Sequence, residues 1–553
     1  MLQGVYAARS VKSADHLDRS LEQLHDFSSM LGMNDAVSIL ADAVMHDKKI
    51  LIVGDFDADG ATSTTIAMKA LAMFGARKVQ FLVPNRFAYG YGLTPELVEE
   101  AKTSAPDVIL TVDNGIANHA GVDAAKKLGI QVVVTDHHLP SDTLPAADAI
   151  VNPNQPNDQF PSKNLAGCGV VFYVMLALRR YLTDNNWFAE QNIPVPTMSR
   201  LLDIVALGTV ADLVPLDHNN RILVHQGLRR IRAGLCAPGI IALLELAKRD
   251  FSRVTATDLG FAVAARLNAA GRLDDMSLGI ECLMAEDAVT ARDLARKLDA
   301  MNTERRGIEK DMQAQAINAL KKLEESLQGE LPKGLVLYDE GWHQGVIGIL
   351  ASRIKERFYR PVIVFAPGQD DEIKGSARSI TGLHVRDALA LIDARHPGLI
   401  KKFGGHAMAA GLTLSNNSLQ KFSEVFDEVV SGQLTEDQLR HCLISDGGLS
   451  EDELSLDVAA MLRDAGPWGQ AFPEPLFDDN FQIVEQRLVG DKHLKLRLMK
   501  DNKVIDAIAF FVDTKEWPNH RCEAIHAAYR LDVNEFRGRS SVQLIIEHFE
   551  ALT

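Results

Sequence analysis

The chain has 553 residues, 46% of them hydrophobic, which predicts several domains, each with its own core. Its formal net charge of −16 argues against a protein that coats nucleic acid with its whole surface, although a local binding groove is compatible with it. No apolar run is long enough to span a membrane, and the N-terminal residues MLQGVYAARS lack an apolar signal region. The five cysteines are scattered without a C-x-x-C pair, so neither a zinc site nor a disulfide framework is predicted, and a reducing cytoplasm is expected.

Residues 1–45 are predicted to be a polar helical extension without recognisable chemistry. Residues 46–215 then alternate between short apolar strands and helix-like segments, a pattern typical of a parallel α/β sheet. The expected strands are Ile50–Val53, Val79–Val83, Val108–Val112, Val132–Thr135 and Ala149–Val151, and the expected helices include Ala61–Phe74, Pro95–Lys102 and Ala117–Leu128.

An acidic loop follows the first of these strands. Asp55, Asp57 and Asp59 stand at alternate positions in GDFDADG, directly before a helix-like segment. Three carboxylates this close repel one another, which is tolerable in solvent, at a helix N-terminus or around a cation. Taken alone, the loop could be a solvated turn or a metal site.

Three further polar clusters favour the metal site. Two strands end in Asp113-Asn114-Gly115 and in Asp136-His137-His138, and ligands of parallel sheets bind beyond such carboxyl ends. Asp212 stands in LLDIVALGTVADLV, which is apolar almost all round and predicts a buried helix. A buried carboxylate needs a partner or a metal. A turn or a salt-bridged aspartate would explain each cluster alone, but together they predict a metal centre.

Residues 216–330 are predicted to be a largely helical connector whose one polar cluster, RLNAAGR, contains Asn268 and Arg272. Residues 331–440 form a second predicted α/β domain with the segments KGSARS and FGGH, which contain Ser376, Arg378 and His406. Small residues beside such side chains let backbone N–H groups approach an anion. A solvated face or a glycine turn without function would also account for these segments.

Residues 441–553 read as short alternating strands punctuated by glycine and proline, which predicts a small β-barrel or sandwich. Phe510, Phe511 and Phe536 could offer stacking faces, as in an oligonucleotide-binding barrel, although many solvated β-domains share this composition. The basic positions of this region are Arg487, Lys492, His493, Lys495, Arg497, Lys500, Lys503, Arg537 and Arg539.

The motifs GDFDADGATS, TVDNG, VTDHHLP and ALGTVADLVPL stand in the order of the DHH phosphoesterase motifs, and the chain resembles that family. With RLNAAGRLDD, WHQGVIGILASRIKERF, GSARS, FGGHAMAAGL and RDAGPWGQAFPEPLF, it resembles the family's bacterial exonucleases for single-stranded DNA over nearly its whole length. The resemblance implies a DHH domain, a helical connector, a DHHA1 domain and an oligonucleotide-binding barrel, which matches the four regions that follow residues 1–45.

The resemblance further implies phosphodiester hydrolysis with two divalent cations, Mn²⁺ or Mg²⁺. Asp113 would bridge the two cations, and a histidine among the ligands suits Mn²⁺ better than oxygen ligands alone do. Asp136 would orient an imidazole, and His138 would donate to the scissile phosphate. The implied ligands are Asp55, Asp57, Asp59, Asp113, His137 and Asp212.

By the same resemblance the substrate is single-stranded DNA, degraded 5′→3′ to mononucleotides in recombination and mismatch repair. A single-strand-binding protein and a recombination helicase are the implied partners of a monomer that needs no membrane. The expected terminal-phosphate pocket is Arg86, Ser376 and Arg378, and the expected strand contacts near the metals are Asn268, Arg272 and His406.

Three alternatives stay open at this point. A DHH phosphoesterase for very short oligonucleotides or cyclic dinucleotides would not need the C-terminal barrel, and a family pyrophosphatase would not need a second nucleic-acid-binding region. A non-catalytic single-strand-binding replication factor should have lost metal carboxylates, whereas all of them are present here.

Overall fold

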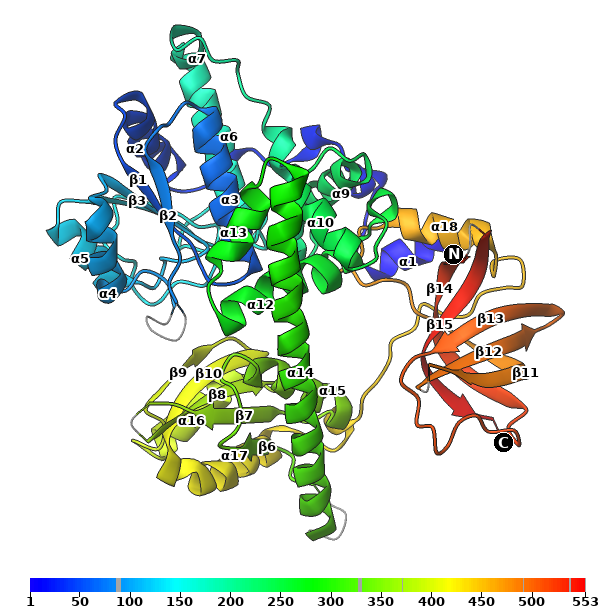
Figure 1. Ribbon diagram of the computed structural model, residues 1–553. Helices are drawn as coiled ribbons and strands as arrows, with labels where there is room; N and C mark the ends of the chain where they lie inside the picture. Colours follow the sequence, from blue (N-terminus) through cyan, green and yellow to red (C-terminus); the bar gives the residue numbers. More distant parts are fainter. Residues whose placement is uncertain (86–90, 327–330, 370, 491, 537–538, 553) are drawn as a thin grey trace. The chain divides into compact units, whose positions relative to one another are not determined.

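The computed structural model describes residues 1–85, 91–326, 331–369, 371–490, 492–536 and 539–552, without the side chains of 322–326 and Phe536. It divides into two compact units (Figure 1). The first contains Met1–Leu298 and Leu443–Thr553, and the second is Asp299–Cys442. In the part of the chain described, no helix combines the length and the apolar character needed to cross a bilayer.

A parallel sheet in the order β2-β1-β3-β4-β5 organises the first unit. Its central strands are buried along their length, which explains their nearly continuous apolar sequences. The strands are β1 (Ile50–Val53), β2 (Val79–Leu82), β3 (Val108–Val112), β4 (Gln131–Thr135) and β5 (Ala149–Val151). The predicted parallel α/β domain is confirmed.

Helices cover both faces of this sheet. Helices α4 (Pro95–Ala101) and α5 (His119–Lys127) share one apolar core with the strands. On the other face α3, α6 and α8 pack against one another (Figure 1). Their bounds, with those of the neighbouring helices, are α2 (Met33–Met45), α3 (Ala58–Met73), α6 (Gly167–Asp184), α7 (Trp187–Glu190) and α8 (Leu202–Ala211).

Helix α3 begins three residues before the predicted start at Ala61. The cause is Asp57, whose carboxylate accepts hydrogen bonds from the N–H groups of Asp59 and Gly60, at 2.9 and 3.0 Å. Such an N-cap satisfies donors that the helix leaves free and fixes where it starts. The acidic loop and the helix are therefore one continuous structure.

A helical connector follows, as predicted. It includes α9 (His218–Arg232), α10 (Pro238–Leu246), α11 (Ala256–Asp258), the π-helical segment η7 (Leu259–Ala264), α12 (Ala265–Leu273) and α13 (Ser277–Met284). The long helix α14 (Ala288–Ser326) begins in the first unit and continues in the second.

The second unit contains a mixed sheet in the order β6-β7-β8-β10-β9. Helix α15 and part of α14 pack on one face, and α16 and α17 pack on the other. The elements are β6 (Leu335–Tyr338), α15 (Ile347–Phe358), β7 (Val362–Pro367), β8 (Glu372–Arg378), α16 (Val385–Arg395), β9 (Lys402–Gly405), β10 (Ala409–Ser415) and α17 (Leu419–Gln433).

The C-terminal part of the first unit is a closed barrel in the order β11-β12-β13-β15-β14, which confirms the predicted barrel. Its elements are α18 (Leu456–Ala465), β11 (Phe477–Val489), β12 (His493–Lys500), β13 (Lys503–Ala509), β14 (Ala524–Phe536) and β15 (Arg539–Ala551). Inward-facing residues alternate along each strand, so one apolar core fills the barrel.

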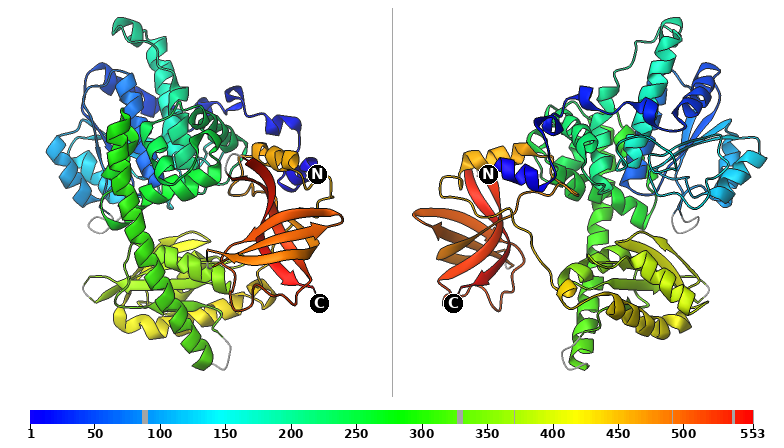
Figure 2. Two further views of the ribbon diagram at one scale, coloured as in Figure 1. Left: turned by 45° about the vertical axis from the view of Figure 1, so that its right-hand side comes forward. Right: turned by 180° about the vertical axis from the view of Figure 1, so that it is seen from behind.

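The N-terminal residues pack against this C-terminal region. In Figures 1 and 2 helix α1 (Leu2–Ala8) lies beside α18. Val5 belongs to the barrel's apolar core, and the guanidinium of Arg9 forms a bidentate ion pair with Asp446, at 2.7 and 2.9 Å. The sequence showed no role for these residues, because the role depends on contacts more than 400 positions away.

Candidate metal centre

The acidic loop between β1 and α3 is held closely from two sides. A side chain at Gly60 would meet the backbone oxygen of Asp55 at 2.5 Å, so only glycine fits the turn. A Cβ at Gly271 of α12 would lie 1.7 Å from the backbone oxygen of Phe56. In addition, Oδ1 of Asn268 accepts a hydrogen bond from Ala58 N–H at 2.8 Å. Helix α12 therefore fixes the loop's conformation.

The carboxylate of Asp59 is bound by the N-terminus of α6. The N–H groups of Gly167 and Cys168 donate to its two oxygens at 2.6 and 3.0 Å. Burial, followed by the charge of Asp57, raises the pKa of Asp59 to about 6, while these hydrogen bonds oppose the shift. A helix N-terminus stabilises the charged form of a carboxylate, so the site is built for an anionic Asp59.

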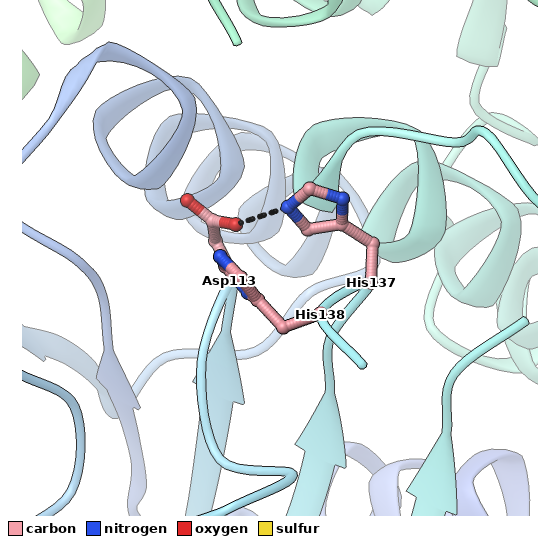
Figure 3. A group of neighbouring side chains, drawn as sticks. All are labelled: Asp113, His137 and His138. Atoms are coloured by element: carbon pink, nitrogen blue, oxygen red, sulfur yellow. Dashed lines mark ion pairs between the residues drawn. The ribbon is translucent and has the colours of Figure 1, made fainter. Parts of the chain in front are cut away.

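Asp113 directly follows β3, and its carboxylate points toward the ring of His137 (Figure 3). Its φ is +62°, an uncommon conformation for a residue other than glycine that is typical of functional sites. Its Oδ1 lies 3.2 Å from Nε2 of His137, at the end of β4. Burial, and then the charges of four surrounding aspartates, raises the pKa of Asp113 well above its usual range.

His137 also approaches Asp212, with Nε2 3.4 Å from Oδ2. Asp212 follows α8, and burial and the neighbouring aspartates raise its pKa well above the usual value. Three groups of side chains offer ligand atoms within 4.8 Å of one another: Asp55, Asp57 and Asp113; Asp59, His137 and Asp212; and Asp113, His137 and His138. The six predicted ligands therefore converge at one edge of the sheet.

This edge fits divalent cations on its own chemistry. Oδ1 of Asp113 is buried and receives no hydrogen bond from the described residues. Oxygen ligands with one imidazole suit Mn²⁺ and Mg²⁺. Bound cations would offset the repulsion that raises the pKa values of these carboxylates.

Asp136 and His138 form a second layer beside the candidate ligands. Oδ1 of Asp136 accepts from the N–H groups of His137 and His138, and Nδ1 of His138 lies 2.8 Å from it. Burial alone would lower the pKa of His138, but the hydrogen bond and charge of Asp136 raise it to about 9. The contact with Asp136 therefore favours the protonated form of His138.

Tyr91 was missed in the sequence. Its hydroxyl donates to the backbone oxygen of Asp113 at 3.1 Å and lies 3.0 Å from Nδ1 of His138. The available signal was its place in YGYG beyond β2, at the same sheet edge as the other clusters. Of the predicted substrate contacts, Asn268 and Arg272 both lie on α12, whereas Arg86 lies outside the described residues.

The second unit brings Ser376 and Arg378 together on one face of β8. Nη1 of Arg378 lies 3.2 Å from Oγ of Ser376, and its Nε donates to Oγ of Ser352 on α15 at 3.2 Å. Burial lowers the pKa of Arg378, and none of the described carboxylates forms an ion pair with it. His406 begins a turn to Ala409, which pairs with Arg378 across the sheet. Arg378 is half-buried, and an arginine shielded from solvent without a carboxylate partner is suited to an anionic ligand.

In the barrel, Phe511 is 76% exposed, and its ring meets that of His493 edge-on at 4.9 Å. Phe510 contacts the same histidine at 5.1 Å. Lys495 is paired with Asp506 and Lys500 with Asp479, so part of the predicted basic surface is neutralised. Arg537 and the side chain of Phe536 lie outside the described residues.

Three segments of the chain match known protein families. Residues 49–209 match the DHH family, N-terminal domain; residues 331–432 match the DHHA1 domain; and residues 445–548 match the RecJ OB domain. The chain is 56% identical to the single-stranded-DNA-specific exonuclease RecJ of Dickeya dadantii, over 99% of this chain and 95% of the relative. It is 54% identical to that of Escherichia coli, with the same coverage.

Solved structures agree with these relatives. The crystal structure of RecJ in complex with Mn²⁺ from Thermus thermophilus matches with a TM-score of 0.80 and 30% identity, over 100% of this chain and 76% of that one. The complex with Mg²⁺ matches with a TM-score of 0.74 and 28% identity, over 100% and 74%.

Proposed function

The chain belongs to the RecJ family of single-stranded-DNA-specific exonucleases, and on this premise we propose that it hydrolyses single-stranded DNA from the 5′ end to 5′-mononucleotides. The observation that carries the proposal is the convergence of six candidate ligands at the carboxyl edge of one parallel sheet. Two divalent cations, Mn²⁺ or Mg²⁺, complete the site in this proposal, as Mn²⁺ and Mg²⁺ are bound in the related structures.

Each of two ligand groups is proposed to hold one cation. Asp55, Asp57 and Asp113 would hold one cation, and Asp59, His137 and Asp212 the other; Asp113, which also groups with His137, would contribute to both sites. When bound, the cations supply an activated water and neutralise charge on the phosphate. The hydrogen bonds from α6 to Asp59 and from α3 to Asp57 preorganise their carboxylates for this task.

His138, in its protonated form, is the proposed hydrogen-bond donor to the scissile phosphate. The contact with Asp136 raises its pKa to about 9 and so favours this form, which can stabilise negative charge that develops on the scissile phosphate. Asp136 holds the ring in place through Nδ1. Tyr91 positions the same ring and the backbone of Asp113.

Polarity requires a separate group that recognises the strand's end. Ser376 and Arg378 are the proposed contacts to the terminal phosphate, supported by the half-buried Arg378, which has no ion-pair partner among the described carboxylates. Arg86, which lies outside the described residues, is a further candidate for this role, and His406 is a proposed strand contact. Asn268 and Arg272 are proposed strand contacts on α12. The barrel would bind the strand farther along, with Phe510 and Phe511 as stacking faces.

The family also suggests a setting for this activity. We propose a role in recombination and mismatch repair in the cytoplasm, as a monomer that works with a single-strand-binding protein and a recombination helicase. The five free cysteines fit a reducing compartment.

End-labelled strands test the proposal. With Mn²⁺ or Mg²⁺, a 5′-labelled single strand should release labelled mononucleotide from the first turnover, while a blunt duplex of the same sequence should resist. Release from the 3′ end would overturn the direction. Binding without cleavage would favour the non-catalytic single-strand-binding factor, and cleavage confined to very short strands would favour the oligonucleotide phosphoesterase.

A further inference from the structure

Two large apolar side chains beside the candidate metal centre are exposed to solvent. Leu213 directly follows the candidate ligand Asp212 and is 70% exposed, and Phe261 is 80% exposed. Single exposed apolar residues are common on protein surfaces and need no explanation. Here, however, Leu213 adjoins a candidate ligand in the chain, and Phe261 lies in η7, which continues directly into α12 beside the acidic loop.

Leu213 lies at the end of α8 in a conformation that branched side chains seldom adopt, with φ of +59°. Its N–H group donates to the backbone oxygen of Val210 at 3.4 Å. A Cβ built on Gly260 would lie 3.4 Å from the side chain of that same Val210. Leu213 and Gly260, the residue before Phe261, therefore both lie next to Val210.

Phe261 stands in the π-helical segment η7, between α11 and α12. A π-helical turn accommodates an extra residue and is frequent at functional sites. The same helical run continues into α12, where Asn268 accepts the hydrogen bond from Ala58 in the acidic loop. Leu213 is thus connected to the metal centre by the adjacent residue Asp212, and Phe261 is connected to the acidic loop by α12.

We propose that Leu213 and Phe261 form an apolar platform on which an unpaired base of the DNA strand stacks while its backbone lies at the metal centre. The occupant follows from continuity with a site for single-stranded DNA, so this inference rests on the proposed function. Every base has an apolar face that can stack on an aromatic ring, so such contacts tolerate any sequence. In a duplex both faces are already stacked on neighbouring pairs, and the platform therefore favours single strands.

The test uses strands in which one of the first six bases at a time is replaced by an abasic residue. Phe261→Ala should lower kcat/KM on the intact strand by about tenfold, within the range reported for stacking aromatics. One abasic position should slow the unaltered protein by a similar factor but should not slow Phe261→Ala further, because the interaction is already gone. Leu213→Ala should act at the same position.

Leu235→Ala is the matched control, since Leu235 is a 61% exposed leucine of the connector outside the candidate site. It should respond to abasic positions as the unaltered protein does. Phe261→Trp should retain the rate, and its added fluorescence should be quenched by oligo(dT). Circular dichroism should show that each variant folds.

The outcomes separate this inference from the function it rests on. If Phe261→Ala and Leu213→Ala leave kcat/KM unchanged, or slow every abasic strand by one common factor, the platform is wrong while the exonuclease proposal stands. A changed sedimentation coefficient with unchanged base dependence would assign the two side chains to a protein contact instead. If the unaltered protein cleaves no strand, the proposed function itself fails.

Discussion

Oδ1 of Asp113 lies 3.2 Å from Nε2 of His137, and this contact joins the ends of two adjacent strands, β3 and β4. It also connects the candidate ligands, because Asp113 groups with Asp55 and Asp57, His137 groups with Asp59 and Asp212, and both residues group with His138. The clustering of these carboxylates therefore causes their mutual repulsion and also creates the proposed site for cations.

Asp113→Asn should abolish hydrolysis and stabilise the metal-free protein. The amide keeps the shape but removes a buried charge that four aspartates oppose, so the free energy of unfolding without metal should rise. Turnover should fall by several orders of magnitude, and Asp113→Ala should lose it likewise. Thermal unfolding with chelator and single-strand cleavage with Mn²⁺ give the two readouts. Near-normal turnover of either variant in Mn²⁺ would contradict the two-metal arrangement.

Binding of Mn²⁺ should compete with protons. Asp59 has a pKa raised to about 6, and the pKa values of Asp113 and Asp212 are also raised well above the usual value, so protons occupy these carboxylates as the pH falls. Each proton must leave when a cation binds, and the affinity should therefore weaken steeply below about pH 6. Titration calorimetry in two buffers with different ionisation enthalpies measures the released protons. A dissociation constant independent of pH between 5 and 7 would contradict this.

The sheet and its polar edge were predictable because local patterns determine them. Strands β1, β3 and β4 are apolar runs followed by aspartates within two residues, and parallel strands place such ends at one edge. Asp212 was recognisable because a carboxylate beside a largely apolar helix needs a partner, although the structure places it just after α8 and not within a helix. The assignment of each residue's role, and the domain boundaries, remain predictions.

Contacts between distant segments were not predictable from local patterns. The hydrogen bonds from Gly167 and Cys168 to Asp59 cross more than 100 residues, and neither residue carries a chemical signal. The packing of Val5 into the barrel core is a similar case. Helix α3 starts three residues earlier than predicted, because Asp57 caps its N-terminus at Ala58.

Asp136→Asn should move the alkaline limb of the pH profile to lower pH. His138 is active as a cation, so activity is present below its pKa of about 9 and is lost as the pH rises through it. The amide removes the charge that raises this pKa, while bound cations lower it in both proteins. Profiles of kcat/KM between pH 6 and 10 provide the comparison. Coinciding alkaline limbs would show that His138 does not carry the required proton.

Phe511→Ala should weaken the binding of long strands by about tenfold without changing its salt dependence. Stacking contributes affinity but no charge, whereas the slope against salt counts phosphate contacts. Point substitution is preferable to deleting residues from Ile444 onward, because deletion would also uncover Val5 of α1. Val504→Ala, another exposed apolar position of the barrel, is the control. Equal affinities of Phe511→Ala and the unaltered protein across chloride concentrations would exclude this stacking face.

Arg378→Ala should selectively slow cleavage of strands that carry a 5′-phosphate. A guanidinium can bind a terminal phosphate in a bidentate way that an internal diester, with fewer free oxygens and less charge, matches less well. Arg378 lies half-buried between Ser376 and Ser352 without a carboxylate partner among the described residues, so a phosphate would supply its missing counter-charge.

The measurement is kcat/KM for two strands that differ only in the terminal phosphate. The ratio of kcat/KM for the phosphorylated strand to kcat/KM for the unphosphorylated strand should fall about tenfold for each 1.4 kcal/mol of binding energy specific to the terminal phosphate that is lost. Arg353→Ala removes an arginine of α15 that is already paired with Glu309, and it should leave the preference intact. Arg86→Ala should act in the same direction as Arg378→Ala. If Arg378→Ala slows both strands by one common factor, Arg378 is a general strand contact, and the end of the strand is recognised elsewhere.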